Sequence, residues 1–157
     1  MTHVNTATAD ASIGHEPPST RLIAGVSVVD TPLITAVIEY AQRLSEPYLF
    51  NHAMRSWLFA EAMGRVRGLD YDREVVAIGT ILHDIGLTTS VLGPNRFEVN
   101  GADAAVSFVR GRGFTDRRTQ LIWDLVAQLD AIAGAAQGAR GGGWHNGDRS
   151  RLRGFRC

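Results

Sequence analysis

Residues 74–86 have the sequence EVVAIGTILHDIG, which is the most informative stretch of the chain for predicting the fold. From Val75 to Leu82 the apolar residues surround nearly the whole circumference of a helix, so that no polar face remains. A helix of this kind normally lies at the centre of its domain. We therefore expect a buried helix that Asp72 caps and that closes at Gly86, a residue suited to a left-handed C-cap.

Four further stretches outside this segment place apolar residues at spacings of three and four, the pattern of an amphipathic helix. Residues 22–29 are apolar and β-branched, and we expect them to form an extended lead-in that packs on the domain. The sequence thus predicts an all-α fold, a bundle of about five helices. Besides the central helix, these are a helix starting at Asp30-Thr31-Pro32 and ended by Pro47, one from about Leu49 to Val66, one capped by Asn100 and one capped by Thr115.

The 157 residues have room for one domain. We expect a disordered arm at residues 1–20, a helical domain at 21–133 and an irregular tail rich in glycine and arginine at 134–157. No apolar run approaches the roughly 20 residues that span a bilayer, which argues against a membrane protein.

Charge and cysteine content narrow the class of protein further. The formal net charge is zero, and the helical region is acidic, so nucleic acid is not an expected partner. Cys157 is the only cysteine and cannot form an internal disulfide, which fits the cytoplasm, as does the absence of a signal-peptide pattern.

His83 and Asp84 stand next to each other at the end of the most apolar helix. Side chains of adjacent residues diverge by about 100° on a regular helix, but near a helix end both can bend toward one point. Imidazole and carboxylate together suit zinc, iron or manganese, and His52 is the only other histidine inside the helical region. The alternative is a hydrogen-bonded core histidine without a metal, and the composition leaves both open.

The pattern Asn51-His52, Arg55 and Ile81-Leu82-His83-Asp84-Ile85-Gly86 resembles the HD-domain superfamily of metal-dependent hydrolases. Its defining feature is a histidine on one helix and a His-Asp doublet at the end of the next. The flanking sequences LFNH (49–52) and RFEVNGA (96–102) look like the branch that includes cyanamide hydratases. The resemblance covers roughly residues 28–128, about two-thirds of the chain.

The resemblance implies that His52, His83 and Asp84 hold a divalent metal ion, which activates a water molecule for attack on a nitrile or a phosphoester. The partner that it implies is thus a small-molecule substrate. Asp84 would also orient the water. Arg55, one helical turn after His52, would bind an anionic group of the substrate or hold Asp84 in place; a structural salt bridge is the alternative.

Arg96 and Glu98 follow the doublet in the expected loop at residues 88–99. They either line the pocket or form a local ion pair, and the second interpretation is the better one.

The sequence departs from the family pattern after residue 128. The family has a further histidine, which we expect near Leu129, and a later aspartate, yet this position is apolar and no later aspartate matches. The tail at residues 140–157 carries five arginines against Asp148. It is either a frameshifted or truncated reading of a longer domain or a natural basic tail.

Two functions therefore stay open at the level of sequence. The first is a metal-dependent hydrolase or hydratase, and the second is a remnant of such an enzyme, impaired by the loss of its C-terminal ligands. Three protein ligands and one water still complete a tetrahedral site. Loss of the last helices would leave apolar surface exposed, and we expect such a surface to favour a homo-oligomer.

Overall fold

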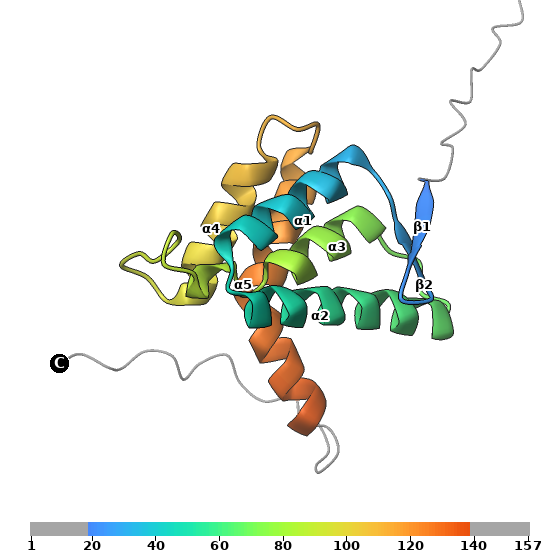
Figure 1. The fold of residues 1–157 in the computed structure, drawn as a ribbon. Coiled ribbons are helices and arrows are strands. Elements are labelled where there is room, and N and C mark those ends of the chain that lie inside the picture. The colour runs from blue at the N-terminus through green and yellow to red at the C-terminus, as the bar shows by residue number, and fades with distance from the viewer. Residues whose placement is uncertain (1–18, 139–157) are drawn as a thin grey trace, which may run out of the picture.

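The computed structural model describes residues 19–138, with side chains up to residue 128. Five α-helices and one two-stranded sheet make up this part of the chain (Figure 1). The elements are β1 (Thr20–Ile23), β2 (Val26–Val29), α1 (Pro32–Leu44), α2 (Pro47–Val66), α3 (Arg73–Leu82), the 3-10 helix η1 (Ile85–Leu87), α4 (Phe97–Val109) and α5 (Asp116–Gly138). The predicted helical class is confirmed, with a small sheet added.

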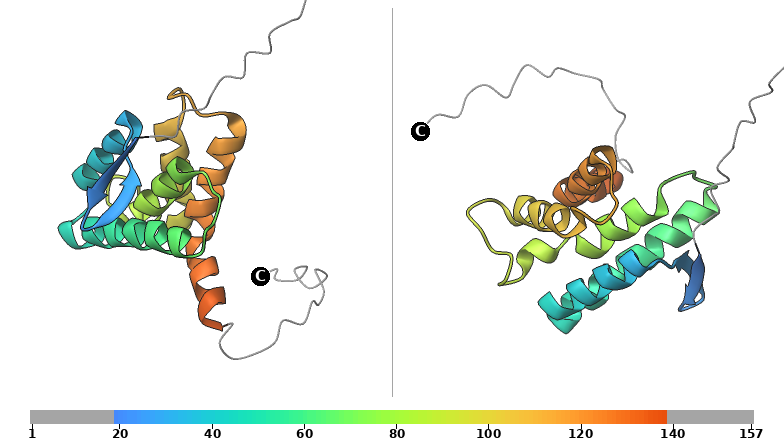
Figure 2. Two further views of the ribbon diagram at one scale, coloured as in Figure 1. Left: turned by 90° about the vertical axis from the view of Figure 1, so that its right-hand side faces the viewer. Right: turned by 90° about the horizontal axis from the view of Figure 1, so that it is seen from above.

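Helix α3 lies at the centre, as its apolar circumference predicts. It contacts all four other helices, and it runs between α2 and α5 in both views of Figure 2. Seven of its ten residues are buried. Gly79 lets α5 come close, because a Cβ atom at this position would lie only 2.8 Å from the Leu125 Cβ. The core is therefore built around the helix that ends in the His-Asp doublet.

The segment expected to be extended at residues 22–29 is extended and packs on the domain, but it belongs to a β-hairpin at residues 20–29 that the sequence did not predict. Strands β1 and β2 pair antiparallel, with Thr20 opposite Val29. Ala24 and Gly25 both have positive φ, 47° and 79°, as a two-residue type I′ turn requires. The hairpin buries Val28 and Val29 completely. Tertiary packing of these valines, rather than sheet length, holds so short a hairpin in place.

Helix starts agree with the sequence where a side chain caps the first turn. Thr31 accepts a hydrogen bond from the Ile34 N–H at 3.3 Å and Asp72 from Val75 N–H at 3.1 Å. Thr115 Oγ1 lies 3.4 Å from the Arg118 nitrogen, at the start of α5.

Two other helix starts differ from the expectation. Pro47 does not merely end the first helix but is the first residue of α2, a position at which its missing N–H costs nothing. Helix α4 begins at Phe97, three residues before Asn100. The Asn100 amide instead donates a hydrogen bond to the Asn95 carbonyl at 3.0 Å.

The end of α3 also differs. The α-helix stops at Leu82, and η1 follows with Asp84 as its N-cap. Gly86 is not among the residues with positive φ, so it is not a left-handed cap. Close packing requires a glycine at this position instead, because a Cβ atom there would collide with the Phe97 carbonyl oxygen.

Both predicted boundaries of the helical domain fall within the described residues, whereas most of the arm and most of the tail do not. Thr20, assigned to the arm, is the first residue of β1, while residues 1–18 lie outside the described residues. Helix α5 continues to Gly138, into the segment predicted as an irregular tail, and residues 139–157 lie outside the description. Within the described residues no helix is both long and apolar enough to cross a membrane.

Candidate metal centre

His52, His83 and Asp84 come together although 31 residues separate the first two. The His52 Nε2 lies 3.2 Å from the His83 Nε2 and 3.5 Å from the Asp84 Oδ2. The His83 Nε2 lies 3.2 Å from the same Asp84 oxygen. One atom of each side chain therefore faces a common point between α2 and the end of α3.

The end of α3 explains why two adjacent side chains can face one point. His83 keeps helical backbone angles, with φ −58° and ψ −35°. Asp84 leaves the helix, with φ −102° and ψ 8°, in the bridge region between helix and strand. This change turns the Asp84 carboxylate back toward the His83 ring. The helix end thus removes the divergence that a regular helix would impose.

A backbone contact fixes the ring of His83. Its Nδ1 lies 2.8 Å from the Thr80 carbonyl oxygen, which can only accept a hydrogen bond. The proton of a neutral His83 therefore sits on Nδ1, and the lone pair of Nε2 points toward the cluster. This role of Thr80 was not predicted from the sequence, although its position three residues before His83 would have suggested it.

The electrostatics of the cluster keep the carboxylate ionised. Burial raises the pKa of Asp84, but the hydrogen bond that a protonated His83 donates and the positive charges that His83 and His52 carry when protonated more than offset it, so that the pKa falls below its usual value. Asp84 is therefore an anion at neutral pH. The side chains of His83 and Asp84 are 6% and 15% exposed, whereas that of His52 is 51% exposed. The cluster is open to solvent on the α2 side.

The three donor atoms fit a tetrahedral metal ion. Ligand atoms about 2.0–2.1 Å from a tetrahedral zinc ion lie roughly 3.3–3.4 Å from one another. The observed separations, 3.2, 3.2 and 3.5 Å, are close to this value. In addition, the lone pair of a neutral His83 faces a carboxylate oxygen, and two acceptors repel unless a proton or a cation lies between them. Among the described residues this is the one group of three side chains suited to a metal.

Arg55 lies on α2 one turn after His52 and is exposed. It forms no salt bridge with Asp84 or with any other described residue. The structural salt bridge considered as an alternative is therefore not observed, and neither is a contact that would hold Asp84 in place. The exposed Arg55 guanidinium, which has no ion-pair partner among the described residues, is free to meet a solute.

Arg96 and Glu98 form the local ion pair that the sequence favoured. The Arg96 Nη2 lies 2.5 Å from the Glu98 Oε1, and the side chain of Arg96 is 82% exposed. Backbone hydrogen bonding, with a further contribution from Arg96, lowers the pKa of Glu98. Neither residue belongs to the metal cluster. Leu129, where a further histidine was expected, lies beyond the described side chains.

Comparison with known proteins adds no relative: the chain matches no protein-family model, no curated protein sequence and no solved structure.

Proposed function

We propose that this chain is a metal-dependent hydrolase or hydratase of the HD type, with His52, His83 and Asp84 as its metal ligands. The observation that carries the proposal is the convergence of three donor atoms from α2 and the end of α3, at separations of 3.2–3.5 Å. The bound ion would be zinc, iron or manganese, all of which accept nitrogen and oxygen ligands. The resemblance of the surrounding sequence to HD-domain enzymes supports the same assignment.

A bound divalent ion would supply a water of lowered pKa, available as hydroxide near neutrality. The chain's own residues serve this chemistry in separate ways. Thr80 holds the His83 ring in the tautomer that presents Nε2. Asp84 contributes a negative charge and a second oxygen that can accept a proton from water. His52 closes the cluster on the exposed side, where a substrate would approach.

Arg55 bears on the choice between the two substrate classes. Cyanamide and simple nitriles are neutral, whereas a phosphoester carries negative charge. Arg55 is exposed, lies one turn from a proposed metal ligand and has no ion-pair partner among the described residues. Such an arginine suits a phosphate group, which accepts its parallel N–H donors. We therefore place a small phosphoester ahead of a nitrile as the substrate, with cyanamide hydration as the alternative within the same mechanism.

A specific observation also favours an impaired remnant as a second candidate. The cluster has three protein ligands among the described residues, and the position near Leu129 carries no metal-binding side chain. A site with fewer protein ligands binds its ion more weakly. Such a chain would keep the helical core while losing turnover.

Metal analysis of the full chain tests the proposal. Purified protein should contain close to one zinc, iron or manganese ion per chain, and His52→Ala should remove it without changing the helical circular dichroism, because His52 is half exposed. Arg117→Ala, an exposed substitution on α5, is the matched control and should keep the ion. A folded protein that takes up none of these ions would refute the proposal.

Activity assays then separate enzyme from remnant. Cyanamide, simple nitriles and a set of nucleoside phosphates are each tested with added zinc, iron(II) and manganese. Turnover that is lost in His83→Ala identifies the enzyme and its substrate class. Stoichiometric metal without turnover of any of these compounds identifies the remnant.

A further inference from the structure

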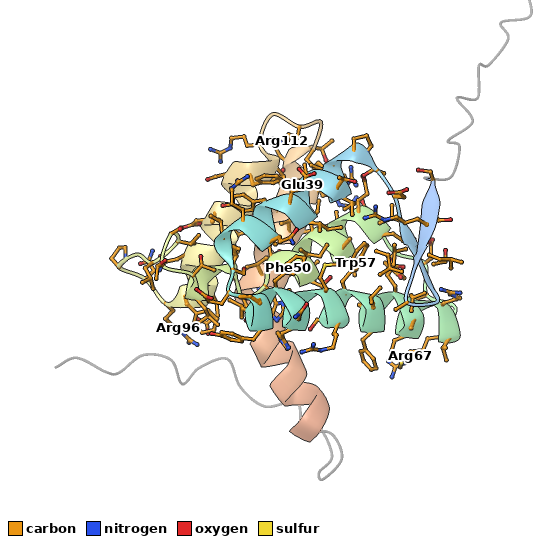
Figure 3. The ribbon with its side chains drawn as sticks, in the orientation of Figure 1. Glu39, Phe50, Trp57, Arg67, Arg96 and Arg112 are labelled. Carbon is orange, nitrogen blue, oxygen red and sulfur yellow. The ribbon has the colours of Figure 1, made fainter. Side chains whose placement is uncertain are left out.

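A cavity lies near the end of α2 that is farther from the metal cluster. It has a volume of about 350 Å³ and is lined by Ser27, Glu61, Gly64, Arg65, Leu69, Tyr71 and Arg73. Glu61 follows His52 by nine residues on α2, which is roughly 13 Å along a helix. Figure 3 shows the length of this helix: Phe50, two residues before His52 in the sequence, and Arg67, just past the end of α2, lie well apart. The cavity is therefore distinct from the metal centre.

A buried carboxylate forms one wall of the cavity. Glu61 is 2% exposed, and its Oε2 accepts three hydrogen bonds, from the Arg73 Nε at 3.0 Å, the Arg73 Nη2 at 2.8 Å and the Tyr71 hydroxyl at 3.2 Å. Its other oxygen, Oε1, is buried without a hydrogen-bond partner. Leaving a buried carboxylate oxygen unsatisfied is costly, so this atom calls for a donor that the described residues do not supply.

The donors on the same wall are held rigidly. Arg73 also donates from Nη2 to the Ser27 carbonyl at 2.9 Å, which fixes its guanidinium between α2 and β2. Its Nη1 makes no hydrogen bond with any described residue. Burial and the negative charge of Glu61 raise the pKa of Tyr71, so its phenol keeps the proton that it donates.

Positive charge exceeds negative charge in the lining. Arg73 neutralises Glu61, whereas Arg65 is exposed and forms no ion pair with a described residue. The cavity thus offers an uncompensated guanidinium and the free Nη1 of Arg73 to an anionic group. A carboxylate can pair with these donors. Because it is small, it also leaves room in the cavity for further groups of the same ligand.

Part of the remaining wall is apolar. The Tyr71 ring lies directly on the backbone of Gly64, where a Cβ atom would come within 2.5 Å of the ring carbon Cε1. Leu69 is 58% exposed beside it. A neighbouring cavity of about 330 Å³ shares Gly64, Leu69 and Tyr71. Its further lining is mixed, with the apolar Ala60, Met63 and Val76 and the charged Arg67 and Asp70. A ligand with an aliphatic side chain could cover this surface.

We propose that the cavity binds a small organic acid that carries a hydrogen-bond donor beside its carboxylate and an apolar side chain, that is, an amino acid or a hydroxy acid. The carboxylate pairs with Arg65 and the Nη1 of Arg73. The ammonium or hydroxyl group donates to the free oxygen of Glu61. The aliphatic side chain lies against Leu69 and Tyr71.

Four probes with one branched carbon skeleton test the proposal. Leucine and 2-hydroxy-4-methylpentanoate carry both groups, 4-methylpentanoate lacks the donor, and 3-methylbutylamine lacks the carboxylate. Each is titrated into the ¹⁵N-labelled full chain with a chelator present, which keeps the metal centre out of the experiment. We expect saturable shifts around Glu61 and Tyr71, with affinities for the two incomplete probes about tenfold weaker, as loss of one charge-assisted contact predicts.

Variants locate the binding. Arg65→Ala alters an exposed side chain and should weaken leucine binding about tenfold, whereas Arg117→Ala on α5 should leave it unchanged. Glu61→Gln should abolish the preference for leucine over 4-methylpentanoate. The proposal is overturned if no saturable shift occurs near the cavity, if the amine binds as well as leucine, or if Arg65→Ala binds leucine as tightly as the natural chain. Equal binding of leucine and 4-methylpentanoate would overturn the assigned role of Glu61.

Discussion

Arg118 on α5 donates two parallel hydrogen bonds to Asp72, the residue that caps α3: Nε lies 2.7 Å from Oδ2 and Nη2 lies 3.0 Å from Oδ1. Nη2 also lies 2.9 Å from the Glu74 Oε2, and the other oxygen of Glu74 accepts the Thr31 hydroxyl at 2.7 Å. Thr31 in turn caps α1. The Arg118 guanidinium thus joins the N-terminal ends of α1, α3 and α5. These contacts hold α3, the helix that ends at His83 and Asp84, in its place.

Substituting Arg118 should therefore lower global stability. The Arg118 and Asp72 side chains are 29% and 38% exposed, so that solvent screens part of the interaction. We expect Arg118→Met to reduce the free energy of unfolding by about 1–2 kcal/mol, the upper part reflecting the bidentate geometry. Urea denaturation at pH 7 measures the change. Arg117→Met, the exposed neighbour, is the control and should change stability by less than about 0.5 kcal/mol.

The same contact gives stability a defined pH dependence. Burial raises the pKa of Asp72, but hydrogen bonds from Arg118 and the Val75 N–H outweigh it, so the pKa lies below the ordinary 3.8. A lowered pKa in the folded state means that this stabilisation is present above pH 3.8 and is lost as the pH falls through the folded value. The stability difference between the natural chain and Arg118→Met should therefore shrink below about pH 4. A difference that stays constant down to pH 2.5 would contradict the assignment.

Arg55 gives the clearest distinction between substrate classes at the metal centre. If it binds a phosphate group, Arg55→Gln should raise KM for a phosphoester about tenfold, the effect of losing one charge-assisted contact. Turnover of a neutral nitrile has no such contact and should not change. Steady-state kinetics on both substrates measure the effect, with Arg43→Gln on the exposed part of α1 as control. An equal loss on both substrates would mean that Arg55 does not recognise charge.

Gly86 connects the doublet to α4, and its substitution should disturb both. A Cβ atom at residue 86 would collide with the Phe97 carbonyl oxygen and lie 2.9 Å from the Gly101 nitrogen, both of them backbone atoms that cannot rotate away. We expect Gly86→Ala to cost more than about 2 kcal/mol and to weaken metal binding, because the doublet must move. Gly111→Ala is the comparison, since its Cβ meets nothing within 4 Å and only its positive φ of 76° is strained. It should cost about 1 kcal/mol and leave metal binding unchanged.

The features that the sequence predicted well are local ones. The apolar circumference from Val75 to Leu82 predicted the central helix, and short polar side chains predicted the helix starts at Thr31 and Asp72. Both kinds of feature depend on residues within about one helical turn of each other. The start of α4 and the role of Gly86 were wrong for the opposite reason. Both depend on how α4 packs against the end of α3, which no pattern within either segment contains.

In the candidate site, too, the local features could be predicted from the sequence and the long-range contact could not. His83 and Asp84 could be selected from their place at the end of an apolar helix, where a carboxylate needs a partner. That the imidazole of His52 meets them required either a family resemblance or a structure, because the contact spans 31 residues and depends on the packing of α2 on α3. The Glu61 cavity was not predicted, since its charged residues lie on two helices and carry no recognisable motif.

The contact between Gly79 and Leu125 allows a sharp test of how α3 and α5 are packed. A Cβ atom at residue 79 would lie 2.8 Å from the Leu125 Cβ and 2.9 Å from its Cδ1. Alanine is favoured over glycine inside a helix by about 1 kcal/mol, which opposes the cost of the clash, about 1–3 kcal/mol. The single variant Gly79→Ala is therefore a poor measure of the contact.

The double variant separates the two effects. Leu125→Ala removes the Cδ1 atom that the new methyl group would meet, so the clash is partly relieved while the helical preference of alanine remains. We expect the double variant to be more stable than the sum of the single changes by about 1 kcal/mol or more, from a double-mutant cycle in urea. Gly79→Ala combined with Leu121→Ala, an exposed leucine one turn earlier on α5, is the control and should be additive. Additivity in both cycles would mean that α5 lies farther from α3 than this packing requires, because only a direct contact couples two substitutions of this kind.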